Sequence, residues 1–382
     1  MHIWKNEEDE ILIFAGLMIL RDYKKVEEEK MYHSFKPGQE WLDTKGRRIQ
    51  AHGGSVIYVD GTYYFYGENK EKTDGRNEIW QWGVRCYASR DLYNWEDKGV
   101  IIPPEPQDKD SSLHPSAHAE RPHIIYNKRT GKYVAWIKVM KTVTILTADN
   151  ILGPYTKVRE YFSPLDMGAG DFDLTVDEAG KAYYYFERVH TETICADLSS
   201  DYTDVTGYYS THFPHVGPPY VREGTAHFLR HGKHYLLTSG TTGYLPNPSE
   251  VAVADSWHGP YHVLGNPHPG DPSNTSFHSQ VSSVFKVPGK KDLYIACADR
   301  WLPQEMGRRY EDYAKSYELR YHPWLEADKE ELERYSPKGI VANTSMSDYV
   351  WLPLRFQEPD NEHPYGMVFI DWLDEWRIED YE

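Results

Sequence analysis

A two-part unit that recurs along the chain constrains its fold more than any other feature of the sequence. The first part is a short apolar strand, a tight turn with glycine, and an aromatic-rich strand, which is the pattern of a β-hairpin. The second part reads as a third strand, a turn and a short outer strand, and it follows four of the hairpins. The hairpins lie at 59–68, 129–137, 178–187, 230–240 and 288–301, and the second parts at 88–99, 147–155, 196–205 and 253–261.

Five such units predict an all-β fold, a five-bladed β-propeller, with one four-stranded blade for each unit. The spacing of roughly 50–70 residues between units is close to that of propeller blades. A β-sandwich with long loops is the alternative, but a sandwich does not explain a repeated two-part unit. Residues 311–337 are partly helical in pattern and are expected to form an excursion before the closing strands. Residues 349–356 and 365–372 are expected to close the propeller, either by pairing with the first blade or by extending the last.

No Pro-, Gly- or Ser-rich linker divides the 382 residues, so we expect one compact unit. Residues 36–382 are assigned to the propeller domain and residues 1–35 to an N-terminal extension. The apolar run at 11–20 is too short to span a membrane and has no signal-peptide cleavage site, so we expect a buried helix or strand there. Three widely spaced cysteines suit a reducing compartment, and with no export signal a cytoplasmic location is expected.

The composition narrows the class of partner. The chain has 31 Tyr and 12 Trp, more than a core needs, and such rings stack well on the apolar faces of sugars. Its formal charge of -17 would repel phosphate backbones and anionic lipids, so neither nucleic acid nor a membrane is expected as a partner. An oligosaccharide is the expected ligand, and the chain is expected to be a monomer or a small homo-oligomer.

Acidic residues stand at matching places beside the predicted hairpins. In a propeller, catalytic groups come from the innermost strands or from the loops at their ends. A glycosidase needs carboxyl groups on both sides of the scissile bond, one of them held protonated. Acidic residues near turns are more often simply exposed to solvent, so their positions make them candidates but do not establish a catalytic role. The candidates are Glu68, Glu120, Asp171 and Glu223.

Eight pieces of sequence between residues 40 and 375 carry a more specific signal. They are IQAHGGSVIYVDGTYYFYGE, CYASRDLYNWEDKG, ERPHIIYNKRTGKYVAW, DLTVDEAGKAYYYF, REGTAHFLRHGKHYLLTSGTTGYLPN, SFHSQVSSVF, ADRW and YVWLPLRF. Each piece alone is weak, but together and in this order they resemble glycoside hydrolase family 43, whose members are five-bladed propellers. Within that family the chain is most similar to the branch of exo-β-1,3-galactanases. The resemblance implies an exo-acting glycoside hydrolase that releases galactose from β-1,3-linked galactan or galacto-oligosaccharides with inversion.

The same resemblance implies roles for particular side chains. Glu223 in REGT matches the general acid of the family. Asp171 matches the aspartate that orients and tunes this acid, with Asp173 as the alternative. The family's usual base, an aspartate, is missing, because Gly53 of HGG occupies its place. The galactanase branch shares this absence, and the matching residue there is a glutamine, here Gln280, which either acts through an imidic-acid form or positions the water.

Further substrate contacts are implied more weakly. Glu120 and Glu68 match carboxylates that contact the sugar. Thr242, Tyr244 and Asn247, together with Thr241, lie in a loop that also reads as ordinary turn chemistry. His52, beside the predicted axis, could reach a central water or a structural Ca²⁺ of the kind that some family members hold, or bond within the core, and we favour the last.

No cofactor is required by this mechanism, and a structural Ca²⁺ is not implied. His114, His118 and His123 invite a zinc interpretation, but Pro115 disrupts the helix in which the first two would share a face. We therefore expect no metal site there. Other family 43 exo-glycosidases, namely β-galactofuranosidase, α-L-arabinofuranosidase and β-xylosidase, are the alternative enzymes. A sugar-binding propeller without catalysis is the alternative from another class.

Overall fold

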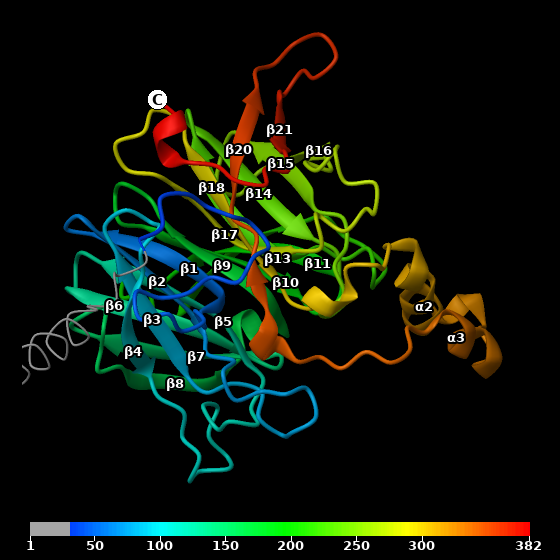
Figure 1. Cartoon of the computed structure of the whole chain (residues 1–382), viewed down its shortest axis with the longest axis horizontal. Coiled ribbons are helices and arrows are strands. Elements are labelled where there is room, and N and C mark those ends of the chain that lie inside the picture. The colour runs from blue at the N-terminus through cyan, green and yellow to red at the C-terminus, as the bar shows by residue number, and fades with distance from the viewer. Residues whose placement is uncertain (1–30) are drawn as a thin grey trace, which may run out of the picture.

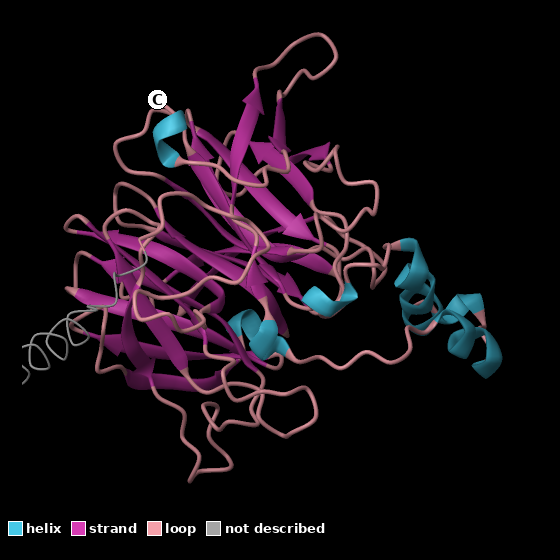
Figure 2. Cartoon of the chain, in the orientation of Figure 1, coloured by secondary structure: helices cyan, strands magenta, loops and turns pink. Residues whose placement is uncertain are grey.

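The recurring units form separate antiparallel sheets in the computed structural model, which describes residues 31–382. The apolar run at 11–20 lies outside the described residues. Five sheets are present, and the chain order of their strands follows the two-part units. This confirms the five-bladed propeller and excludes the sandwich. Figure 2 shows how strongly strands dominate the molecule.

The first three blades have the same four-stranded meander. Blade one is β1 (His52–Val59), β2 (Thr62–Glu68), β3 (Val84–Ser89) and β4 (Glu96–Ile102). Blade two is β5 (Ala119–Asn127), β6 (Lys132–Val139), β7 (Thr142–Ala148) and β8 (Thr156–Phe162). Blade three is β9 (Ala169–Val176), β10 (Ala182–Arg188), β11 (Glu192–Leu198) and β12 (Val205–His212), preceded by the short helix η1 (Pro164–Asp166).

Blade four repeats the meander, whereas blade five is completed only after the helical excursion. Blade four is β13 (Glu223–Arg230), β14 (Lys233–Ser239), β15 (Glu250–Ala254) and β16 (His262–Gly265). Blade five is β17 (Gln280–Lys286), β18 (Tyr294–Arg300), β19 (Asp348–Tyr349), β20 (Leu352–Gln357) and β21 (Met367–Ile370). Because β20 pairs with β18, the closing strands extend the last blade and do not pair with the first.

The excursion between β18 and β19 is helical, as the sequence predicts. It contains α2 (Glu311–Tyr321) and α3 (Lys329–Tyr335), with the short helices η2 (Pro303–Glu305), η3 (Pro323–Leu325) and η4 (Thr344–Met346). Figure 1 shows α2 and α3 projecting from the edge of the propeller. A last short helix, η5 (Ile378–Asp380), precedes the C-terminus. In the part of the chain that the structure describes, no helix has both the length and the apolar character needed to cross a membrane.

Turn chemistry sets the register of the inner hairpins. Asp60 and Gly61 join β1 to β2 with φ of 47° and 81°, and His231 and Gly232 join β13 to β14 with φ of 50° and 75°. Two successive residues with positive φ form the tight turn whose twist matches that of the paired strands. The glycines of VDGT and RHGK therefore fix where each hairpin folds back.

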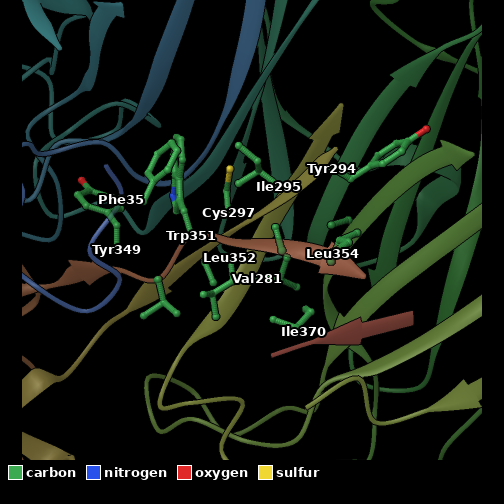
Figure 3. Close-up of a cluster of buried hydrophobic side chains, with 14 of the residues drawn as sticks. Phe35, Val281, Tyr294, Ile295, Cys297, Tyr349, Trp351, Leu352, Leu354 and Ile370 are labelled. Atoms are coloured by element: carbon green, nitrogen blue, oxygen red, sulfur yellow. The ribbon is translucent and has the colours of Figure 1, made fainter. Parts of the chain in front are cut away.

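The innermost strands β1, β5, β9, β13 and β17 contact one another in a closed ring. The two ends of the described chain meet beside this ring, where the backbones of Phe35 and Trp376 pair and their rings stack 4.3 Å apart. Figure 3 shows Phe35 beside Trp351 in the same buried cluster, which also includes Val281 of β17. Trp351 is 1% exposed, and burial of a side chain of this size contributes roughly 1.5–3 kcal/mol. The ring of blades is thus closed by residues from both ends of the described chain.

Candidate active site

A β-bulge lies near the beginning of each innermost strand. The strand register shifts between His52 and Ser55, between Glu120 and His123, between Glu223 and Ala226, and between Val281 and Ser283, with a matching shift opposite β9. A bulge re-aims the side chains beside it and increases the local twist. At these positions it explains how side chains from several blades converge on one point of the axis.

Three of these bulges place a residue in the left-handed region, with φ of 58° at Gly53, 52° at Arg121 and 60° at Gly224. Their backbone N–H groups donate to carboxylates of a neighbouring blade. The amide of Gly53 donates to Asp299 at 2.9 Å, that of Arg121 to Glu68 at 3.0 Å, and that of Gly224 to Asp171. A Cβ on Gly53 would lie 2.5 Å from Glu68 Oε1, so glycine is required where the carboxylate of the next strand comes closest.

The converging side chains line a cavity of about 210 Å³ on the propeller axis. It is lined by Glu68, Trp80, Glu120, Arg121, Lys138, Asp171, Glu223, Gly243, Tyr244, Gln280 and Trp301. Six of the predicted site residues are therefore brought together. They are Glu68, Glu120, Asp171, Glu223, Tyr244 and Gln280.

Glu223, the first residue of β13, is partly buried in this cavity. Burial raises the pKa of its carboxyl well above the usual range, and the negative charges of Asp171 and Glu187 raise it further. Lys138 and Arg121 act in the opposite direction but do not cancel the rise. A carboxyl group kept protonated in this way is suited to donate a proton.

Asp171 on β9 has the opposite character, although it is buried too. Burial alone would raise its pKa, but the charges of Arg121 and Lys138 hold that pKa well below the usual range. Lys138 Nζ lies 2.8 Å from one carboxylate oxygen and Arg121 Nη2 lies 3.1 Å from the other. Asp171 thus stays ionised beside Glu223. The pKa values of the two carboxyl groups are shifted in opposite directions, which is the arrangement expected for a general acid and the residue that tunes it.

A lysine joins two of the carboxylates. Lys138, near the end of β6, also lies 2.6 Å from Glu120. Glu120 and Asp171 therefore share one cation, and Glu120 is held at the cavity wall. On the far side of Glu120, Glu68 pairs with the fully buried Lys70 at 2.7 Å.

Gln280, the first residue of β17, has its amide group fully engaged by neighbours. Its Nε2 donates to Ser239 Oγ at 2.9 Å and to Glu223 Oε1 at 3.4 Å. Its Oε1 accepts the indole N–H of Trp301 at 3.0 Å. The amide is therefore in contact with the candidate acid itself.

Aromatic rings form one wall of the cavity. The Tyr244 ring lies 5.7 Å from Trp80 and 5.1 Å from Trp301. Trp80 stacks on His118 at 3.8 Å, and Lys70 donates to the Trp80 carbonyl at 2.9 Å. The polar floor and aromatic wall together form a surface of the kind that binds sugar rings.

Three predicted contact residues lie behind the cavity wall. His52 is buried, with Nδ1 3.0 Å from Asp299. Asn247 bonds the Gly240 backbone through both amide atoms, and Thr242 donates to the Leu245 carbonyl. The structure thus gives His52 the core hydrogen bond that we favoured, and it places Thr242 and Asn247 as supports of the loop that carries Tyr244.

Asp173, the alternative to Asp171, belongs to a different part of the axis. One of its carboxylate oxygens lies 3.1 Å from His123 Nδ1, and the other accepts from the His227 backbone amide at 2.7 Å. Together with later residues of all five inner strands it lines a second cavity of about 380 Å³, which does not share a lining residue with the first. His123 is thus separated from His118, which packs on Trp80, and from His114, which bonds Ser116.

Sequence reasoning did not identify several residues that line the cavity. Trp80 lies in the loop after β2, and the high aromatic content was the only hint of it. Arg121 directly follows Glu120 and Lys138 lies near the end of β6, but neither position carries a local signal that its side chain lines the cavity. Arg300, next to Trp301, donates to the carbonyls of Phe277 and Gly38.

Comparison with known proteins agrees with the geometry. The sequence profile of "Glycosyl hydrolases family 43" matches residues 49–316. A protein of Escherichia coli (strain K12), named provisionally as a beta-xylosidase, is 28% identical over 229 residues, which are 54% of this chain and 40% of that protein. The chain thus spans less than half the length of this curated relative.

Solved structures resemble a larger share of the chain. A GH43 β-1,3-galactosidase is 28% identical with a TM-score of 0.72, over 91% of this chain and 64% of that one. A second, solved with galactodeoxynojirimycin, is 26% identical with a TM-score of 0.71, over 90% of this chain and 100% of that one. An exo-β-1,3-galactanase of Phanerochaete chrysosporium, solved with β-1,3-galactotriose, is 23% identical with a TM-score of 0.68, over 90% and 68% of the two chains, and shows the fold alone.

Proposed function

The chain belongs to glycosyl hydrolase family 43, and from this premise we propose that it is an exo-acting hydrolase that releases galactose from β-1,3-linked galacto-oligosaccharides or galactan. The observation that carries the proposal is the pair of unlike carboxyl groups in one cavity. Asp171 is held ionised by Arg121 and Lys138, and beside it Glu223 has a raised pKa. A sugar-binding protein has no need for such a pair, whereas a glycosidase does.

The size of the cavity supports exo action. Its volume of about 210 Å³ is below the roughly 300–1,000 Å³ of sites for drug-sized ligands, so it suits a single sugar ring. A terminal galactose would enter it and the rest of the chain would remain outside. Two observations support galactose as the sugar. Glu120 and Glu68 are held in place and can accept a hydrogen bond from an axial hydroxyl. Two of the similar solved structures are those of GH43 β-1,3-galactosidases.

In the proposed mechanism, Glu223 gives its proton to the oxygen of the leaving group as the glycosidic bond breaks. Water attacks the anomeric carbon from the opposite face, so the configuration inverts, and the proton that this water releases passes to solvent, from which Glu223 is reprotonated. Ionised Asp171 keeps the proton on Glu223 until that step. The aromatic wall of Trp80, Tyr244 and Trp301 holds the ring against the carboxylates.

Gln280 is the proposed partner of the attacking water, in place of an aspartate base. The acid and base groups of inverting enzymes are about 6.5–9.5 Å apart. Gln280 Nε2 is only 3.4 Å from Glu223, and its Oε1 faces Trp301. The proposal therefore requires that Gln280 Oε1 faces a water across the sugar when galactose is bound, which a structure with galactose in the cavity would test directly.

Hydrolysis of β-1,3-galactobiose and of a panel of aryl glycosides, followed by NMR of the anomer released, tests the proposal. We expect galactose as the product, with the α-anomer appearing first, and a loss of 10²–10⁴-fold in rate for Glu223→Gln. If the β-anomer appears first, inversion is wrong. Faster turnover of aryl xylosides or arabinofuranosides would assign a different family 43 activity. No turnover, with equal galactobiose binding by wild type and Glu223→Gln, would identify a sugar-binding propeller.

A further inference from the structure

Three exposed aromatic rings lie close to the start of β13, where Glu223 is located. Tyr220 is 45% exposed, Tyr321 is 41% exposed and Trp324 is 57% exposed. Singly exposed aromatic side chains are common on protein surfaces, whereas a group of them close together is typical of a binding surface. We call Tyr220, Tyr321 and Trp324 the rim platform.

The rim platform is continuous with the cavity wall. Tyr317 of α2 donates its hydroxyl to the Thr242 carbonyl at 2.7 Å, next to Gly243, which lines the cavity. Tyr317 also packs on Gly243 itself, because a Cβ at Gly243 would lie 3.8 Å from the Tyr317 hydroxyl oxygen. α2 is therefore anchored through Tyr317 to the loop that lines the cavity at Gly243.

From this anchor the helix leads outward to the platform. Tyr321 follows Tyr317 by four residues, on the same face of α2 and about 6 Å further along its axis. His322 ends the helix, lies 5.9 Å from the Tyr220 ring and stacks on Trp324 at 4.8 Å. Tyr220 also donates its hydroxyl to Glu318 of α2. Tyr220 and Trp324 therefore both contact His322 at the end of α2, and Tyr321, the residue before it, lies 6.0 Å from the His190 ring.

The chemistry of the reaction determines which part of a substrate can meet this surface. The acid must protonate the oxygen of the leaving group, so the leaving part of the chain lies on the Glu223 side of the cavity. The cavity holds a single ring, and the sugars of the leaving group must lie outside it. The rim platform is an exposed aromatic surface connected to that side, because Tyr220 precedes Glu223 in the chain and α2 is bonded to the loop that lines the cavity.

We propose that the rim platform binds the second and later sugar units of the substrate, on the leaving-group side, by stacking on their apolar faces. This inference rests on the proposed function for the direction of the chain. It assigns the excursion between β18 and β19 to recognition of substrate length. The ligand class is a β-linked galacto-oligosaccharide of three or more units.

The test compares kcat/KM for β-1,3-galactotetraose with kcat/KM for β-1,3-galactobiose. We expect wild type to prefer the tetraose, and Trp324→Ala or Tyr321→Ala to lower the ratio of the two values by about tenfold, which corresponds to about 1.4 kcal/mol. Tyr58→Ala is the matched control, because Tyr58 is 46% exposed and lies near the opposite end of β1 from the cavity. It should leave the ratio as in wild type.

Two results would overturn the inference. One is a wild-type enzyme with no preference for length. The other is a fall in kcat/KM for both substrates by the same factor in the platform variants, which would indicate damage to the cavity wall through α2. If wild type hydrolyses neither substrate, the proposed function fails separately. Calorimetric binding of the tetraose then decides the inference, which survives only if Trp324→Ala weakens binding and Tyr58→Ala does not.

Discussion

The same inner strands line two cavities on the propeller axis, and the buried carboxylates of the two cavities have different surroundings. Asp171 and Asp173 are two residues apart on β9, and each lines one of the two cavities. Asp171 is held by two cations, Lys138 and Arg121, whereas Asp173 lies beside His123 and accepts hydrogen bonds from the backbone amides of His227 and its own neighbour Leu174. The comparison shows that burial of a carboxylate does not by itself make a site. What distinguishes Asp171 is its pair of cations and the neighbouring carboxyl group of Glu223, whose pKa is raised.

Among substitutions that test the difference between the two cavities, the largest loss of rate is expected on β17, whose residues also line both cavities. Gln280→Ala removes the amide beside Glu223, and we expect kcat to fall by about 10²–10³-fold, as for loss of one precisely placed polar group in an active site. Ser283→Ala, in the middle of the strand and on the wall of the second cavity, is the matched control and should stay within about threefold of wild type. Near wild-type rates for Gln280→Ala would remove Gln280 from the mechanism.

The two aspartates themselves provide the next test. Asp171→Asn leaves Lys138 and Arg121 without their shared anion, and we expect kcat/KM to fall by about 10–100-fold. Asp173→Asn should leave kcat/KM nearly unchanged but lower the free energy of unfolding by about 1–3 kcal/mol, because a buried hydrogen-bond acceptor is replaced in part by a donor. Steady-state kinetics and urea unfolding measure the two quantities. The opposite assignment of effects would make Asp173 the tuning residue.

A change in pH dependence should accompany the loss of rate in Asp171→Asn. Glu223 must be protonated to act, so kcat/KM falls as pH rises through its raised pKa. After burial, the charge of Asp171 is the largest cause of that rise. Its removal, with two cations left nearby, should lower the pKa and move this fall in activity to lower pH. A pH–rate profile that keeps its wild-type midpoint would show that Asp171 does not tune Glu223.

The smallest expected effect concerns stability. Because the folded chain raises the pKa of Glu223, its contribution to stability is complete below the ordinary glutamate pKa and is lost as pH rises through the raised value. Glu223→Gln removes this dependence, so its melting temperature should exceed that of wild type by roughly 2 °C at neutral pH and by less in acid. An identical pH dependence of melting for the two proteins would contradict the raised pKa.

The sequence predicts the blades well because each hairpin is specified locally. The turn at Asp60 and Gly61 and the aromatic strand after it carry their own register, so no distant contact is needed to recognise them. The excursion at 311–337 was also recognised from its local pattern. Whether the closing strands joined the first or last blade depended on contacts between distant segments, and the sequence left that open.

The site was predictable only in part, because the bulges change which side chains of the inner strands face the axis. Glu223 and Asp171 were found through motifs, and the structure places both in the cavity. Lys138 looked like an ordinary strand residue, because its partners Glu120 and Asp171 come from two other strands. Strict alternation along a strand also fails where a bulge intervenes, so nothing local shows that Arg121 faces the axis.

The backbone amides of Gly53, Arg121 and Gly224 connect the site to the architecture. Each donates across a boundary between blades, to Asp299, Glu68 and Asp171 in turn. Glu68 and Asp171 therefore serve as joints between blades as well as walls of the cavity. A blade cannot swing away from its neighbour at these joints without pulling a carboxylate out of place. The same hydrogen bonds therefore hold neighbouring blades together and keep the carboxylates of the candidate site in position.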